Sequence, residues 1–234
     1  MIEQILQNVL VSLYRTFIEK DRYMAFVKGL GVTLEISLFA VLLGTAIGII
    51  VAVVKFSAKR SKWMWLPEKI CNAYVGIIRG TPVYVQLLIM NGIILSNVKN
   101  SMIIAILTFG INSGAYVSEI IRAGINSVDR GQMEAGCSLG LGYGTVMKSI
   151  ILPQAVKNIL PALGNEFIAL IKETSIAGVL AISDITKAAE RVQGATYEMY
   201  TPLLSVAVIY FIIVMGLTKL LGVFERRLSA SDKH

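Results

Sequence analysis

The sequence predicts an all-α membrane protein with five transmembrane helices, an N-terminal helix at the membrane surface and a cytoplasmic helix between spans three and four. Of its 234 residues, 55% are hydrophobic and only 16% are charged. The mean hydropathy of +0.69 exceeds what a soluble domain of this length needs for its core. Four runs without charged residues hold 19 or 20 residues each, about the length that crosses a bilayer: Ile36–Val54, Gly80–Val98, Asn100–Ser118 and Met199–Thr218.

The first 27 residues predict an amphipathic segment. One helical stripe, opposite Glu3, Gln7 and Asn8, is formed by apolar side chains: Ile2, Ile5, Leu6, Val9, Leu10, Leu13 and Phe17. This pattern is typical of a helix that lies on the outer leaflet, although a helix packed on the bundle would show it too. The start at Met1 has no basic segment and no small-residue cleavage site, so we expect no removable signal peptide.

The membrane domain is expected over residues 28–224, followed by a tail at 225–234. Its spans are predicted near 28–55, 70–96, 100–123, 153–183 and 200–224. The fourth span is interrupted by Glu166, Lys172 and Glu173. It is still counted, because the connection from Ser118 to Met199 would otherwise be far too apolar for a loop.

Basic residues predict the orientation, because cytoplasmic loops carry an excess of lysine and arginine. With the N-terminus outside, seven basic residues lie outside and thirteen lie inside, the latter being Lys55, Lys59, Arg60, Lys62, Lys69, Arg122, Arg130, Lys148, Lys157, Lys219, Arg226, Arg227 and Lys233. The same surplus accounts for the net charge of +7 without a nucleic-acid partner. We therefore expect the N-terminus outside and the C-terminus in the cytoplasm. Two pairs of small residues, Gly44–Gly48 and Gly110–Gly114, would let helices approach closely.

The longest cytoplasmic connection, residues 124–152, has helical chemistry. Asp129 with Gln132 three residues later resembles a capping box. Three glycines at 140, 142 and 144 then interrupt the helical pattern, which resumes at Thr145 and is expected to stop at Pro153. Two short helices joined by a glycine hinge are predicted.

Several motifs in this connection and in the spans resemble one family. Residues 130–136 (Arg-Gly-Gln-Met-Glu-Ala-Gly), Gly140 and Ile151-Leu152-Pro153 resemble the EAA loop of ABC-importer permeases. The resemblance extends over nearly the whole chain to the polar amino-acid subfamily, whose permeases have five spans, through Arg79-Gly80-Thr81-Pro82, Asn112-Ser113-Gly114-Ala115-Tyr116, Leu163-Gly164-Asn165-Glu166-Phe167 and Lys172-Glu173-Thr174-Ser175.

The resemblance implies that the EAA loop forms a coupling helix that docks on a separate ATPase. The residues expected to serve this docking are Arg130, Gly131, Glu134, Ala135, Leu139 and Gly140. The chain departs from the family at two positions. Gly136 stands where a second alanine is usual, which should cost an isolated helix about 1 kcal/mol. Asp129 stands where proline is common, but it remains a good N-cap.

Charged and polar side chains at membrane depth are the candidates for the substrate path. They are Arg79, Thr81, Asn165, Glu166, Lys172, Glu173 and Ser175. Pro82 should break the second span, and Arg79 just before it could bind a substrate carboxylate or instead form an internal salt bridge to Glu166 or Glu173. Glu166 beside Asn165 suits an ammonium group, although an ion-pair network that fixes helix packing would use the same residues. Glu35 and Glu119 lie close enough to span ends to reach water.

No enzyme chemistry is expected in this chain. Residues 142–149 lack the second glycine of a phosphate-binding loop, and the only histidine is His234. No metal ligand cluster is therefore predicted, and ATP and Mg²⁺ would be bound by the partner ATPase.

The resemblance also implies partners: an ABC ATPase dimer, a second permease chain that is identical or similar, an extracytoplasmic substrate-binding protein, a polar amino acid and membrane lipid. It places the chain in a prokaryotic cell membrane. Two other hypotheses stay open, which are an ion-coupled carrier or channel made of two such chains and a membrane scaffold that transports nothing.

Overall fold

The computed structural model describes residues 1–58 and 61–230. Over these residues the chain is helical and contains no strand, as predicted. Its helices are α1 (Ile2–Leu13), α2 (Tyr23–Ala58), α3 (Trp65–Gly80), α4 (Val83–Ile89), α5 (Ser101–Asn126), α6 (Arg130–Ser138), α7 (Tyr143–Val146), α8 (Leu152–Glu173), α9 (Ile185–Thr196) and α10 (Thr201–Ala230). Lys59, Arg60 and Lys233 of the charge count, together with the tail from residue 231 on, lie outside the described residues.

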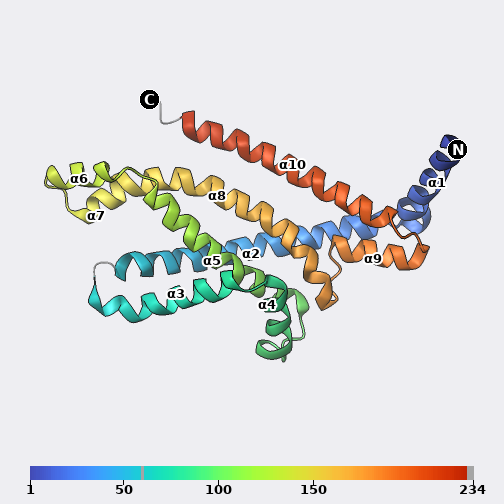
Figure 1. Cartoon of the computed structure of the whole chain (residues 1–234), viewed down its shortest axis with the longest axis horizontal. Coiled ribbons are helices and arrows are strands. Elements are labelled where there is room, and N and C mark those ends of the chain that lie inside the picture. The colour runs from blue at the N-terminus through green and yellow to red at the C-terminus, as the bar shows by residue number, and fades with distance from the viewer. Residues whose placement is uncertain (59–60, 231–234) are drawn as a thin grey trace.

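Three described helices are long and apolar enough to cross a membrane: α2, α5 and α10. A fourth candidate consists of Lys62–Gly80 and Val83–Ile94, which are bent by 108° at the break between them. α8 is not among these candidates, and the charged residues Lys157, Glu166, Lys172 and Glu173 lie along it. It nevertheless runs the length of the bundle, from the end that holds α6 and α7 to the end that holds α9 (Figure 1).

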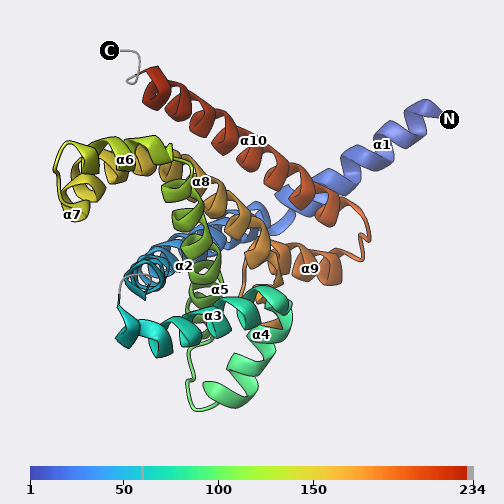
Figure 2. The ribbon, with the colours of Figure 1, turned by 60° about the vertical axis from the view of Figure 1, so that its left-hand side comes forward.

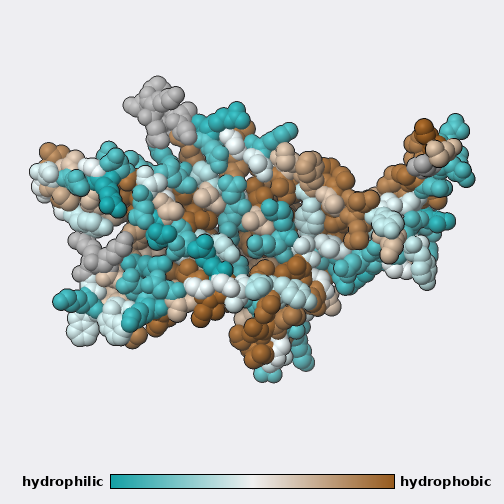
Figure 3. Space-filling model, in the orientation of Figure 1, coloured by the Kyte–Doolittle hydropathy of each residue, from teal (hydrophilic) through white to brown (hydrophobic). Residues whose placement is uncertain are grey.

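The two ends of the molecule differ in what they hold. At one end lie α6, α7, the last turn of α2, the first turn of α3 and the end of α10, while α1 and α9 lie at the opposite end in both views (Figure 1, Figure 2). The segments expected to be cytoplasmic therefore gather at one end. A large hydrophobic surface covers α4 and the segment after it (Figure 3).

The centre of the bundle is the contact between α2 and α5, where the predicted glycine pairs meet. A Cβ atom on Gly44 would lie 2.8 Å from the Ser113 Cβ, and one on Gly48 would lie 2.5 Å from Val117 Cγ1. Real Cβ atoms do not approach this closely, so only glycine permits the contact. Around it, Ile36, Leu87, Phe109 and Leu170 belong to the main buried cluster.

The N-terminal helix α1 projects away from the bundle (Figure 2). Of its predicted apolar stripe, Ile2, Leu6, Val9 and Leu10 are exposed. Its end is fixed to the turn before α10, where Ser12 Oγ donates to Glu198 Oε2 at 2.7 Å. Over these residues the stripe does not pack on the bundle.

Helix α9 is an element that the sequence patterns did not reveal. Asp184 caps it by accepting hydrogen bonds from the backbone N–H groups of Thr186 (3.0 Å) and Lys187 (3.2 Å). The start of α9 packs on α2, where a Cβ on Gly29 would lie 2.8 Å from the Asp184 carbonyl oxygen. Part of the predicted connection before the last span is thus an ordered helix.

Candidate transport pathway and docking helix

The bent span breaks where the sequence predicts, between Gly80 and Val83. Pro82 has no N–H and Thr81 is extended, so the carbonyl groups of Ile77 and Ile78 lose helical partners. Side chains replace them: Thr81 Oγ1 donates to the Ile77 carbonyl at 2.8 Å, and Gln86 Nε2 donates to the Ile78 carbonyl at 2.8 Å. The freed backbone groups are therefore satisfied by protein, as a break at membrane depth requires.

Gln86 is in turn held by α5. Its Oε1 accepts a hydrogen bond of 3.0 Å from Asn112 Nδ2, and both side chains are buried. The sequence prediction did not assign either residue to the site. The signal was present, because each is an amide in the middle of an otherwise apolar run, and a buried amide needs partners.

Arg79, in the last turn of α3, extends over an aromatic ring of α5. Its guanidinium carbon lies 5.2 Å from the centroid of the Tyr116 ring, which is within the range of a cation–π interaction. In the part of the chain that the structure describes, no ion pair joins Arg79 to Glu166 or Glu173. The side chain is exposed, so its charge is available to a ligand.

Glu166 of α8 is anchored at the contact with α5. Ser113 Oγ donates to Glu166 Oε1 at 2.7 Å, and Ser113 itself is fully buried. The other carboxylate oxygen, Oε2, accepts no hydrogen bond from a described residue. The structure thus leaves one oxygen of a half-buried carboxylate unused.

Arg79 and Glu166 both contact side chains of α5. Ser113 and Tyr116 are three residues apart, so they are neighbours on one side of the helix. Ser113 holds the anionic Glu166 and Tyr116 holds the cationic Arg79. Both residues lie in a motif noted in the sequence, but the site prediction did not include them.

The remaining predicted path residues are not joined to this pair. Asn165 and Lys172 are exposed on α8, Glu173 ends that helix, and Ser175 lies in the 3₁₀ segment Thr174–Leu180 that follows. No hydrogen bond or ion pair joins any two of these four side chains in the part of the chain that the structure describes. Thr81 is tied to Gln86 at 2.9 Å rather than to α8.

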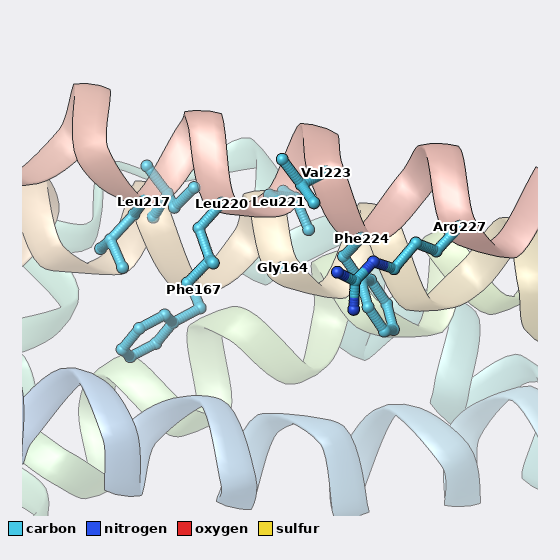
Figure 4. A pocket seen from close by; sticks show the side chains of 9 residues that line it. Gly164, Phe167, Leu217, Leu220, Leu221, Val223, Phe224 and Arg227 are labelled. Atoms are coloured by element: carbon cyan, nitrogen blue, oxygen red, sulfur yellow. The ribbon is translucent and has the colours of Figure 1, made fainter.

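Gly164, just before Asn165, allows α10 to approach α8. A Cβ at this position would lie 2.6 Å from Leu221 Cδ1. The two helices line a largely apolar pocket of about 430 Å³, in which Leu217 and Leu220 of α10 lie on the side of Phe167 of α8, and Phe224 lies further along α10 beside Arg227 (Figure 4). Elsewhere α10 is mostly exposed, with only 6% of its apolar window buried.

Glu119 forms ion pairs near the end of α5. Its carboxylate is paired with Lys55 Nζ at 3.0 Å and with Arg122 at 2.8 Å. The sequence prediction, that Glu119 lies close enough to the span end to reach water, did not include these two partners. Glu119 links the ends of α2 and α5.

The predicted docking helix is α6. Asp129 caps it as expected, since its Oδ1 accepts a hydrogen bond of 2.6 Å from the Gly131 N–H. At the other end Gly140 has a φ of +80°, with its N–H bonded to the Cys137 carbonyl at 3.0 Å and the next N–H, of Leu141, bonded to the Gly136 carbonyl at 3.1 Å. This is the Schellman arrangement that ends helices at glycine.

One face of α6 is buried and the other is free. Gly136 packs on Val146 of α7, whose Cγ2 would lie 2.7 Å from an added Cβ. This contact explains why glycine replaces the alanine of the family pattern. All six predicted docking residues are exposed, and Leu139 is 82% exposed. They are Arg130, Gly131, Glu134, Ala135, Leu139 and Gly140.

The expected stop at Pro153 is wrong. The helix continues from α7 through a π-helical turn, Met147–Ile151, directly into α8. Pro153 falls within the first two positions of α8, where a missing N–H is tolerated. The π turn precedes the proline and provides the altered hydrogen-bond register.

Comparison with known proteins decides the family. The profile described as "Binding-protein-dependent transport system inner membrane component" matches residues 29–230. The chain belongs to this family. It is therefore an inner-membrane transport subunit, and ATP hydrolysis is carried out by a separate subunit.

Individual relatives agree with this assignment. The arginine transport system permease protein ArtQ of Bacillus subtilis is 39% identical over 88% of this chain and 93% of its own. The putative glutamine transport system permease protein GlnP of Rickettsia felis is 40% identical over 88% of this chain and 94% of its own. A crystal structure of an amino acid ABC transporter with histidines has a TM-score of 0.83, with 42% identity over 90% of this chain and 98% of that one.

Proposed function

We propose that this chain is the permease subunit of an ABC importer for a polar amino acid, with α8 as the fourth of five spans. The observation that carries the proposal is that two side chains of opposite charge contact residues of α5 that are three positions apart, Glu166 through Ser113 and Arg79 through Tyr116. An amino acid carries both an ammonium and a carboxylate group, so it needs partners of both signs. The arginine and glutamine permeases named above support this substrate class.

In this proposal the unused oxygen of Glu166 accepts a hydrogen bond from an ammonium or basic side chain of the substrate. Arg79 binds the substrate carboxylate, and Thr81 lines the path beside it. Asn165, Lys172, Glu173 and Ser175 line the path along α8, where their polar groups are free to replace the hydration of the substrate.

The substrate site is tested by Glu166→Gln. Loss of one charge-assisted hydrogen bond should lower substrate uptake by reconstituted transporter about tenfold or more. Glu190→Gln, in an exposed pair with Lys187, serves as the matched control and should leave uptake unchanged. Wild-type uptake by Glu166→Gln would remove this residue from the site.

We further propose that the exposed face of α6 docks on the ATPase. Leu139, which directly follows α6, is an exposed leucine near the charged residues of that helix, which is typical of a surface that another protein covers. Glu134→Lys and Leu139→Ala should each reduce both co-purification of the ATPase and substrate-stimulated ATP hydrolysis. Glu3→Lys in α1, at the opposite end, is the matched charge-reversal control. Normal coupling in both α6 variants would contradict the docking role.

The assembly follows from the same proposal. A second permease chain, identical or similar, would cover part of the exposed α10, and two ATPases would bind at the end that holds α6. An extracytoplasmic binding protein would deliver substrate at the end that holds α1 and α9. This arrangement puts the N-terminus outside and the C-terminus in the cytoplasm of a prokaryotic cell.

The ion-coupled carrier that the sequence left open would also hold charges at membrane depth, but the family match favours the ATP-driven importer. Uptake into liposomes driven by an ion gradient, with no ATPase present, would favour it. The importer requires ATP and the partner ATPase for any uptake above background.

A further inference from the structure

A second cavity, unrelated to Glu166 and Arg79, opens between α2, α5 and the α7–α8 helix. Its volume is about 620 Å³, which is within the range of sites that bind small molecules. Most of its wall is apolar, with Ile49 and Val53 from α2, Ile125 from α5, and Met147, Val156 and Leu160 from the long helix. We call it the α2–α8 groove.

The polar groups of the α2–α8 groove are concentrated at one end. Ser57 near the end of α2, Tyr143 at the start of α7 and Lys148 in the π turn lie at the end of the molecule that holds α6. Apart from these three residues, Thr45 of α2 is the one residue of the described lining whose side chain has a polar oxygen or nitrogen atom. The lining therefore changes from cationic and polar to apolar over its length.

Lys148 is the charged residue of this lining. It is exposed, and it forms no ion pair with any residue that the structure describes. A lysine beside an apolar groove, at the proposed cytoplasmic end of the spans, is suited to an anion whose remainder is hydrocarbon. Lysine binds phosphate as a point charge, and basic sites between spans on this side of a membrane bind anionic lipid headgroups.

We propose that the α2–α8 groove binds an anionic phospholipid of the inner leaflet, with an acyl chain along Ile49 and Leu160 and the headgroup phosphate at Lys148. A polar amino acid does not fit this site, because the apolar section would leave its ammonium and carboxylate groups without partners. A hydrocarbon chain meets no such cost.

The position of the groove gives the lipid a consequence for transport. One wall belongs to the helix that continues from α7, on which α6 packs through Gly136 and Val146. The other wall belongs to α2 and α5, the centre of the bundle. A bound lipid fills the space between the docking element and the core, and its loss would leave that space open.

The proposal is tested by lipid binding to the whole transporter complex. Native mass spectrometry of the delipidated complex would follow its titration with phosphatidylglycerol and, separately, with phosphatidylcholine. We expect phosphatidylglycerol to bind preferentially. Lys148→Gln should weaken this binding about fivefold, the contribution of one lysine near an anionic surface. Lys62→Gln, a basic residue outside the groove, should leave it unchanged.

A second pair of variants tests the hydrocarbon site. Ile49→Trp places a bulky ring inside the groove and should reduce phosphatidylglycerol binding, whereas Ile50→Trp, at an exposed neighbour that does not line the groove, should not. Equal binding of both lipids, or equal binding by all four variants, would overturn the proposal. Loss of subunit assembly in Ile49→Trp alone would also overturn it, in favour of a protein interface.

The lipid-binding experiment and the test of the proposed transport function can fail independently of each other. Uptake of substrate in Glu166→Gln reports on the transport site, and phosphatidylglycerol binding in that variant should equal that of the wild type. The inner-leaflet assignment rests on the proposed orientation, whereas the binding measurement does not.

Discussion

At the scale of single residues, Gln86 does most to make the bent span possible. Its amide nitrogen serves the Ile78 and Thr81 carbonyls at 2.8 and 3.1 Å, and its oxygen is held by Asn112. A break in a span without such a side chain would leave carbonyl groups unsatisfied in an environment without water. The Gly80–Pro82 break and Gln86 therefore form one functional unit.

Replacing this side chain tests the unit. Gln86→Leu keeps the size but removes all of these hydrogen bonds, so it should destabilise the protein by about 2–4 kcal/mol, since each unsatisfied buried group costs about 1–3 kcal/mol. The readout is a lower thermal midpoint of the purified protein. Gln154→Leu, which removes one exposed hydrogen bond to the Ile150 carbonyl, is the control and should change little. Equal midpoints for both variants would contradict this role.

Residue roles were only partly predictable from the sequence. The break before Pro82 and the cap at Asp129 were predictable, because proline and N-cap chemistry are local. The partners of Arg79 and Glu166 were not, since Tyr116 and Ser113 are distant in sequence and only packing of α3 and α8 on α5 brings them close. Lys148 was counted as a basic loop residue, and its place in a groove depends on three separate helices.

At the scale of elements, α6 depends on its contact with α7. The helix has nine residues, too few to be stable alone, so its packing through Gly136 on Val146 matters. The same contact fixes how α6 is presented to a partner. Gly140 ends the helix in a left-handed conformation that other residues adopt at a cost.

The variant Gly136→Val should separate α6 from α7. The added side chain overlaps Val146, so we expect a cost of about 1–3 kcal/mol and reduced ATPase stimulation by substrate. Gly144→Val is the matched control, because nothing lies within 4 Å of a Cβ at that exposed position. If Gly136→Val retained full stimulation, presentation of α6 by α7 would not be required for coupling.

At the scale of the whole molecule, close packing of α2 on α5 sets the centre about which other helices arrange. The glycine pairs were predicted from their spacing alone, and the partner of each glycine came only from the structure. By contrast, α9 escaped prediction because its mean hydropathy is low and its buried face becomes evident only against α2 and α10.

The central contact is tested with Gly48→Val. A Cβ at Gly48 would lie 2.5 Å from Val117 Cγ1, so the variant should lower the thermal midpoint markedly, as overpacking typically costs about 1–3 kcal/mol. Gly31→Val, in the same helix with nothing within 4 Å, controls for the change in helix propensity. A similar midpoint for the two variants would contradict the central role of this contact.

Sidedness is tested by thiol labelling in intact cells with a reagent that does not cross membranes. In a chain whose Cys71 and Cys137 are replaced by serine, Gln4→Cys should react from outside, and Leu139→Cys only after the cells are opened. The reverse pattern would invert the proposed topology.

The helix from Tyr143 to Glu173 runs without interruption from the docking end to Glu166, through the π turn and Pro161. A carboxylate about 5 Å from a helix axis moves roughly 2.5 Å when the helix turns by about 30°. That displacement is enough to break the 2.7 Å hydrogen bond from Ser113 Oγ. If the ATPase docks on α6 as proposed, a rotation that it imposes on this helix would free Glu166 from Ser113, so that the proposed binding of the substrate depends on the angle of one helix.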